Sequence, residues 1–277
     1  MRRMKRLNGR ARLRRRAWAL LALCALLVAL SAVAPLIAPN DPYATDPLRM
    51  NAAPGGRYPL GTDRYGRCVL SRVLMGARTS IASATALVGA MFLIGTALGM
   101  LCGYYGGALD ALVMRLADLM LSIPQMVLAI AVAGVLGGSL ANAMIAIGVS
   151  GWTGFARLAR GQVLSLKREP YILAARLSGD GGFKILFRHM LPNALGPLLV
   201  NAASQLGATM MAIAGLSFLG IGVAPPTAEW GSMINESRAY IQLAPWAVLA
   251  PAAAMVIAVM LFNLLGDTAR DLLEVGE

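Results

Sequence analysis

The side chains that most often carry catalysis or bind metals are scarce in this sequence of 277 residues. It contains one histidine, His189, and three cysteines, Cys24, Cys68 and Cys102. It has no G-x-x-x-x-G-K loop followed by Ser or Thr, no H-E-x-x-H pair and no Cys/His cluster with zinc spacing. The odd number of cysteines also argues against a disulfide framework. We therefore expect no catalytic residue, no metal site and no cofactor bound by this chain.

The residues whose types and spacing do suggest chemistry form one polar stretch, 168–193, between long apolar segments. Helix formers fill 171–177, and Pro170 precedes them at a first turn, where a missing N–H costs nothing. Glycines in 178–182 allow positive φ and stop that helix. Residues 183–191 then restart a short helix that mixes apolar and basic side chains. We expect two short helices around a glycine bend.

This polar stretch is suited to contact with another protein rather than to a reaction. Ala174 and Ala175 are small, and the glycine bend follows them, so a partner's surface can approach closely. We predict that a motor subunit docks here. The alternative from the local features is an ordinary cytoplasmic loop held by basic residues.

The composition around the polar stretch is that of an integral membrane protein. Hydrophobic residues make up 58% of the chain and charged residues 14%, with a mean hydropathy of +0.65. A helix needs roughly 20 apolar residues to cross a bilayer, and six such segments can be placed. They are residues 18–38, 81–103, 113–136, 140–155, 191–215 and 246–265. We predict an all-α polytopic protein with a single transmembrane domain, 18–273, after a basic tail, 1–17.

The Lys and Arg residues orient these spans. Nine of them lie between residues 1 and 17, and seven more lie between residues 157 and 188. Segments rich in Lys and Arg stay in the cytoplasm, so six spans place both termini and the polar stretch on that side. The loop between the first two spans is also rich in Arg, yet it has to lie outside. We expect its part 67–78 to be a short amphipathic helix along the membrane surface, with Asp63 as an N-cap.

The basic balance of the chain, a formal net charge of +12, is explained by the lipid bilayer. Most of the basic residues flank the predicted spans, where they anchor helix ends at the membrane surface. The chain lacks a surface of interleaved aromatic and basic residues, on which nucleic-acid bases stack. We therefore expect the bilayer and no nucleic acid as a partner.

The ionisable residues of the spans sit near the span ends. A proton- or sodium-coupled transporter usually places carboxylates or histidines within its spans. A transport role would therefore need external energy, which indicates a permease driven by separate ATPases. A scaffold or assembly protein and a secondary transporter are the alternatives from other classes.

Glycine and proline residues within the spans predict how the helices pack. Gly95, Gly99 and Gly103 recur every four residues, so they lie on one face that suits close contact with another helix. Pro124 lies inside the third predicted span and is expected to kink it.

Polar side chains at helical spacing suggest two further contacts. Asn201 and Gln205 are four residues apart and share a face of the fifth span, where they either line a pore or bond to another helix. Arg115 and Asp118 are three residues apart and are expected to pair. We take Asn201 and Gln205 as candidate substrate-path residues.

The polar stretch resembles the cytoplasmic signature of a family, the inner-membrane permeases of ATP-binding-cassette importers in their peptide and nickel branch. That signature is Glu-Ala-Ala, three residues, Gly and, further on, Leu-Pro. The matching residues are Ala174, Ala175, Gly179, Leu191 and Pro192, with Leu173 in place of the leading Glu.

Three further segments match the same branch in order. They are LGTDRYGR at 60–67, LSFLGIG at 216–222 followed by EWG at 229–231, and NLLGDTARD at 263–271. Cys68 stands where Asp is usual. The resemblance covers nearly all of residues 18–273.

The resemblance implies a type I importer permease fold with six transmembrane helices and a cytoplasmic coupling helix, in the bacterial inner membrane. It also implies an assembly with a second homologous permease, two ATP-binding-cassette ATPase subunits that hold ATP and Mg²⁺, and an extracytoplasmic substrate-binding protein. The ATPase-docking residues that it implies are Tyr171, Ala174, Ala175, Arg176, Gly179, Leu191 and Pro192.

Two segments, 173–179 and 226–235, are more similar to nickel permeases than to dipeptide permeases of this branch. The implied substrate is nickel or a nickel chelate, with import of dipeptides or oligopeptides as the alternative. Each of these solutes needs a polar path, which Asn201 and Gln205 suit. We expect selectivity to lie mostly in the binding protein.

Overall fold

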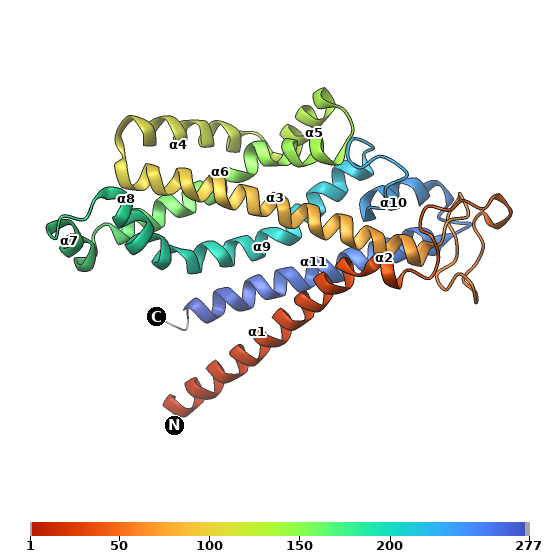
Figure 1. Ribbon diagram of the computed structural model, residues 1–277, viewed down its shortest axis with the longest axis horizontal. Coiled ribbons are helices and arrows are strands. Elements are labelled where there is room, and N and C mark those ends of the chain that lie inside the picture. The colour runs from red at the N-terminus through yellow and green to blue at the C-terminus, as the bar shows by residue number, and fades with distance from the viewer. Residues whose placement is uncertain (1, 275–277) are drawn as a thin grey trace.

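The computed structural model describes residues 2–274, and within that range every regular element is a helix. The long helices run side by side along the long axis of the molecule (Figure 1). In chain order the elements are α1 (Arg2–Ala32), α2 (Ala34–Ile37), η1 (Pro47–Arg49), α3 (Val69–Tyr105), α4 (Gly107–Ser122), α5 (Gln125–Leu136), α6 (Leu140–Leu166), α7 (Pro170–Leu177), α8 (Gly182–Lys184), the π-helical turn η2 (Ile185–Met190), α9 (Leu191–Phe218), α10 (Trp230–Ser237), η3 (Arg238–Tyr240) and α11 (Pro245–Glu274). The predicted all-α class is confirmed.

Four helical stretches are long and apolar enough to cross a membrane: 12–32 of α1, all of α3, the continuous run 182–218, and α11 up to residue 273. The bent pair α4–α5 is a fifth. α6 has 27 residues, but it does not reach the same apolar content. The predicted count of six spans therefore stays a prediction, and it depends on the segment 140–155 of α6.

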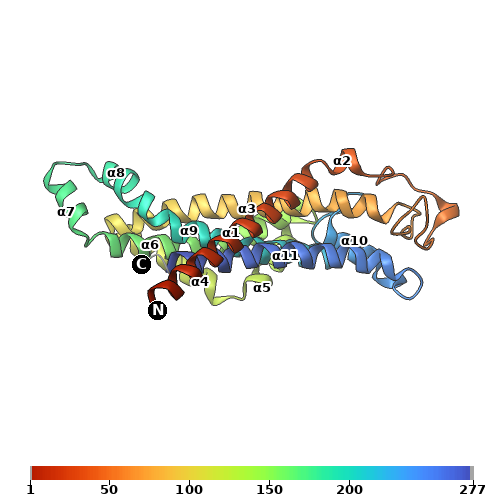
Figure 2. The same cartoon turned by 90° about the horizontal axis from the view of Figure 1, so that it is seen from below.

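The two ends of the bundle carry different structures. α7 and α8 lie at one end, and the long loop between α2 and α3 lies at the other (Figures 1 and 2). α1 begins and α11 ends toward the end that carries α7. Residues 2–17, predicted as a basic tail, are helical and continue into the first predicted span as part of α1.

α3 and α6 are in backbone contact along the glycine face predicted from the sequence. A Cβ on Gly95 would lie 2.4 Å from the carbonyl oxygen of Trp152, and one on Gly99 would lie 2.1 Å from that of Ala156. A Cβ on Gly103 would lie 2.9 Å from the Cβ of Val163. No side chain fits at such distances, so glycine lets the two helices approach. The prediction of close packing is confirmed.

The third predicted span is two helices rather than one kinked helix. α4 and α5 are bent by 92° at the break between them. Ile123 is extended there, with φ −102° and ψ 132°, because the ring of Pro124 excludes the helical conformation of the preceding residue. The proline thus divides the span into two helices.

Two ion pairs tie α4 to α6. Asp118 pairs with Arg157, so the predicted pairing of Asp118 with Arg115 is wrong. Asp110 accepts two hydrogen bonds from Arg160, at 2.6 and 2.7 Å. Both α4 carboxylates therefore pair with arginines of α6, about 40 to 50 residues further along the chain, rather than with a basic residue of α4 itself.

A buried charge cluster closes the opposite end of the bundle. Arg67 and Arg72 are 3% and 1% exposed, and both bond to Glu236 of α10. Arg67 also pairs with Asp63, at 2.6 Å between Nε and Oδ2. Burial of these charges is tolerated because each has an opposite charge within hydrogen-bond distance.

This charge cluster corrects two predictions. Segment 67–78 is no separate surface helix, because α3 runs unbroken from Val69 and turns Arg72 into the protein. Asp63 does not cap α3, whose N-cap is Cys68 without a side-chain bond. Asp63 instead accepts the N–H groups of Tyr65 and Arg67 within the loop.

The glycine face of α3 can be tested by one added methyl group. Gly99→Ala should lower the free energy of unfolding in detergent by about 1–3 kcal/mol, the usual cost of overpacking. Gly89→Ala is the matched control in the same helix, because its Cβ would meet nothing within 4 Å. Its stability should be unchanged or slightly raised, since Ala is the better helix former. Equal melting temperatures for the two variants would contradict the contact.

Candidate functional site

Helix α7 forms the tip of the polar stretch, and its sequence explains both of its ends. Pro170 opens the helix at its first turn. Gly179 ends it with φ +83°, a conformation that residues with a Cβ adopt at a cost. The N–H of Gly179 bonds to the oxygen of Arg176, at 3.0 Å, and that of Asp180 bonds to the oxygen of Ala175, at 3.1 Å. This pair of bonds is a Schellman motif, and the predicted helix with its glycine stop is confirmed.

One face of α7 is anchored and the other is open. Ile172 is fully buried in an apolar cluster beneath the helix. Tyr171 and Leu173 are 41% and 49% exposed, and Leu177 is 91% exposed. A short helix held through one buried side chain therefore presents apolar side chains at the very end of the molecule.

The apolar cluster beneath α7 is built from five elements of the fold. Its fully or nearly fully buried members are Met100 of α3, Ala159 and Val163 of α6, Ile172 of α7, Ile185, Leu186 and Met190 of η2, and Ala194 and Leu198 of α9. We call this set the α7 cluster. It ties α7 to three of the long helices.

The glycine bend after α7 is held by charged side chains. Asp180 accepts a hydrogen bond from Lys184, at 2.5 Å, and contacts Nε2 of His189 at 3.1 Å. These two partners, Lys184 first, lower the pKa of the Asp180 carboxyl below its usual value. The only histidine of the chain thus faces a carboxylate. Among the residues that the structure describes, no group of three or more His, Cys, Asp or Glu side chains could hold a metal ion.

The structure gathers most of the predicted docking residues on one surface. Tyr171, Ala174 and Arg176 are exposed on α7, and exposed Gly179 follows at the bend. Ala175 is half-buried against the α7 cluster. The remaining two lie on the other side of the bend, at the start of α9. Of these, Leu191 packs inward against the α7 cluster and Pro192 is exposed.

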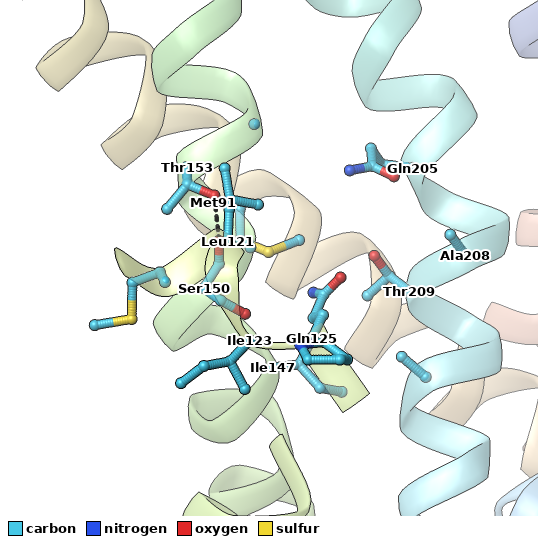
Figure 3. A pocket seen from close by; sticks show the side chains of 15 residues that line it. Met91, Leu121, Ile123, Gln125, Ile147, Ser150, Thr153, Gln205, Ala208 and Thr209 are labelled. Atoms are coloured by element: carbon cyan, nitrogen blue, oxygen red, sulfur yellow. Dashed lines mark hydrogen bonds between the residues drawn. The ribbon is translucent and has the colours of Figure 1, made fainter. Parts of the chain in front are cut away.

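A central cavity of about 240 Å³ lies between α3, the α4–α5 break, α6 and α9. Figure 3 shows its lining, in which hydroxyl and amide groups alternate with apolar side chains. The polar lining residues are Gln125, Ser150, Thr153, Gln205 and Thr209, and no charged residue lines the cavity. The arrangement can hold a small polar solute.

Sequence reasoning found part of this cavity. Gln205, one of the two candidate path residues, lines it, whereas Asn201, one turn earlier in α9, does not. Ser150 and Thr153 were missed, although they are hydroxyl residues three apart within an apolar segment. Gln125 was missed as well, because its place depends on the α4–α5 break.

Comparisons with known protein families cover most of the chain. Residues 95–275 match the family described as binding-protein-dependent transport system inner membrane component. Residues 9–54 match the N-terminal TM domain of oligopeptide transport permease C. Together the two matches leave residues 1–8, 55–94 and 276–277 uncovered.

Three relatives illustrate the similarity in sequence. The dipeptide transport system permease protein DppC of Alkalihalophilus pseudofirmus is 40% identical, over 87% of this chain and 79% of the relative. The glutathione transport system permease protein GsiD of Pectobacterium atrosepticum is 41% identical, over 90% and 83%. The nickel transport system permease protein NikC of Escherichia coli K12 is 39% identical, over 92% of both chains.

A solved structure shares the fold. A chain of the MetNI methionine ABC transporter, in an inward-facing conformation, superposes with a TM-score of 0.55 at 20% identity. The match covers 73% of this chain and 95% of that chain. The likeness shows a type I importer permease fold and nothing about substrate.

The central cavity can be tested for water access by thiol labelling. In a background without Cys24, Cys68 and Cys102, all of them buried, Ala208→Cys should react with a water-soluble thiol reagent, because Ala208 is exposed in the cavity lining. Ile213→Cys, five residues further along α9 and 1% exposed, should stay unreacted. If both positions are equally unreactive, the cavity is closed to water.

Proposed function

The chain belongs to the family of binding-protein-dependent transport system inner membrane components and is a permease subunit of an ATP-binding-cassette importer, and from this premise we propose how it works and what it carries. In this proposal α7 is the coupling helix that docks on an ATPase subunit. The central cavity is part of the path for a short peptide or a chelated metal.

The observation that carries the docking proposal is the contrast between the two faces of α7. Its open face offers apolar side chains at the end of the molecule, Leu177 above all. Its closed face holds Ile172 without any exposure. A cleft in an ATPase subunit would cover the open face. The closed face, through Ile172, would transmit the motion to the membrane helices.

The α7 cluster supplies the route for that motion. It joins α7 to α3, α6 and α9, and these same three helices line the central cavity. Closely packed interiors transmit displacement rather than absorb it. We infer that closing of the ATPases on ATP moves α7 and turns the helices from an inward-open to an outward-open arrangement, and that hydrolysis resets them. ATP and Mg²⁺ would be held by the ATPases, since this chain has no phosphate-binding loop.

The proposed assembly contains a second homologous permease, two ATPase subunits and an extracytoplasmic binding protein. In the proposed orientation α7 and both termini are cytoplasmic. Two observations support it: α1 begins and α11 ends toward the α7 end (Figure 1), and the first 17 residues carry nine basic residues. The loop between α2 and α3 would then face the binding protein.

The chemistry of the cavity bears on the substrate. Amides, hydroxyls and the thioethers of Met91 and Met120 line it, without imidazole or carboxylate groups, whereas a bare divalent transition metal is bound best by imidazole and other strong donors. This favours a short peptide, or nickel carried within a chelate, over the free ion. Relatives named for dipeptide and for nickel are about equally similar, so nickel import is kept as the second candidate.

The docking proposal is tested at the glycine bend. Gly179→Val forces a β-branched residue to φ +83°, so it should distort the end of α7 and abolish ATP-driven uptake while the protein remains in the membrane. Gly181→Val is the matched control, because Gly181 is also exposed, has φ −68° and its Cβ would meet nothing within 4 Å. Uptake should be retained there.

A second change at the same surface adds charge. Ala175→Asp places a carboxylate against the α7 cluster, whose buried members are all apolar, and should also abolish uptake. Immunoblots of isolated membranes and copurification of the ATPase subunits are the controls. Normal uptake by Gly179→Val or Ala175→Asp would refute docking through α7.

The substrate is tested by uptake of radioactive nickel in cells with and without the gene, each with and without excess dipeptide. Gene-dependent nickel uptake that ignores dipeptide would establish the nickel candidate. Gene-dependent dipeptide uptake with unchanged nickel uptake would establish the peptide candidate. If neither uptake depends on the gene, both substrate proposals are wrong.

A further inference from the structure

The α4–α5 break leaves the start of a helix at the central cavity. Ile123, Pro124 and Gln125 all line the cavity. No side chain caps α5, and the N–H groups of Val127 and Leu128 bond to the oxygen of Pro124. Within the part of the chain that the structure describes, the N–H groups of Gln125 and Met126 have no backbone or capping partner. Such a helix start carries partial positive charge and accepts an anionic oxygen.

A second, independent group faces the same place. Ser150 of α6 is 4% exposed, and its Oγ has no hydrogen-bond partner among the described residues. Figure 3 shows this hydroxyl pointing toward the turn at Ile123 and Gln125. An unpaired buried hydroxyl is costly, and an acceptor bound in the cavity would satisfy it.

The rest of the lining suits an anionic oxygen and not a bare cation. The amides of Gln125 and Gln205 and the hydroxyl of Thr209 can donate hydrogen bonds. No Asp or Glu lines the cavity to repel a carboxylate. A cation would face the positive end of α5 without a counter-charge.

We infer that Ser150 and the uncapped start of α5 form a subsite for a carboxylate group of the transported solute. The carboxylate can be the free C-terminus of a short peptide or a carboxylate of an organic chelator that holds a metal. The inference rests on the proposed function only in taking the cavity as part of the transport path.

The subsite can be tested without the binding protein by protection of a thiol. The reporter is Ala208→Cys, in the background free of the three native cysteines, within the purified permease–ATPase complex. Its rate of reaction with a neutral water-soluble thiol reagent is measured against increasing concentrations of alanylalanine, alanylalanine amide, nickel citrate or nickel chloride. Alanylalanine should slow the reaction, and the amide, which has the same size but no carboxylate, should not. Nickel chloride is the control that measures protection by direct binding of the ion to the reporter thiol.

The nickel citrate arm separates the two sources of the carboxylate. Protection by alanylalanine but not its amide assigns the subsite to peptides, and protection by nickel citrate beyond that by nickel chloride assigns it to chelates; either outcome supports a carboxylate subsite. The inference is overturned if alanylalanine protects no more than its amide and nickel citrate protects no more than nickel chloride.

Ser150→Ala removes the hydroxyl without adding volume. It should raise the half-protecting concentration of the effective carboxylate by about two- to tenfold, as expected for one lost hydrogen bond. Gln125→Glu should raise it further by placing a negative charge beside the subsite. Thr96→Val is the matched control, because Thr96 is also buried with an unpaired hydroxyl but does not line the cavity. An unchanged half-protecting concentration in both Ser150→Ala and Gln125→Glu would overturn the inference.

This result is independent of the uptake assays. Loss of the carboxylate preference with intact gene-dependent uptake would refute the subsite and leave the proposed function standing. Protection by carboxylates together with uptake that does not depend on the gene would refute the proposed function and leave the subsite.

Discussion

The backbone contact between α3 and α6 is the constraint on which the rest of the structure depends. From Gly95 through Gly99 to Gly103, α3 lies so close to α6 that no Cβ fits between them. In a membrane, where apolar burial gains little, such contact is a principal way to hold two helices together. Two features of the structure lie on either side of this contact. Toward the middle of the helices, Met91 lies over Gly151 and borders the central cavity, and toward the end lies the α7 cluster.

The two ends of this scaffold are held by different physics. At the loop end, Arg67 and Arg72 are almost completely buried, and both bond to Glu236. Removing one partner from such a set leaves an uncompensated buried charge, so the set acts as a unit and fixes the loop onto α10. At the other end, α7 itself is held by apolar contacts, through Ile172 in the α7 cluster. The loop end is thus held by buried ion pairs, whereas α7 is held through one buried side chain. This difference suits a protein whose motion is driven from the α7 end.

The central cavity joins these properties to the proposed transport. It is bordered by α3, α6 and α9, which the α7 cluster connects to α7, and by the break at Pro124. A broken helix within a membrane leaves backbone groups without partners, and this is tolerated only where a cavity or protein satisfies them. The same break that interrupts the third predicted span therefore supplies the polar groups of the cavity.

The sequence by itself determined the features that depend on neighbours along the chain. Apolar runs gave the helical class, and the signature around Gly179 gave α7 and its stop, because backbone preferences and hydropathy act within a few residues. Only the tertiary structure decided which distant groups meet. Asp118 pairs with Arg157 instead of the arginine three residues before it, and Ser150 faces Gln125 across the cavity. These pairings follow from the distances between helices and from the 92° bend at the α4–α5 break. No pattern among neighbouring residues encodes those distances or that angle.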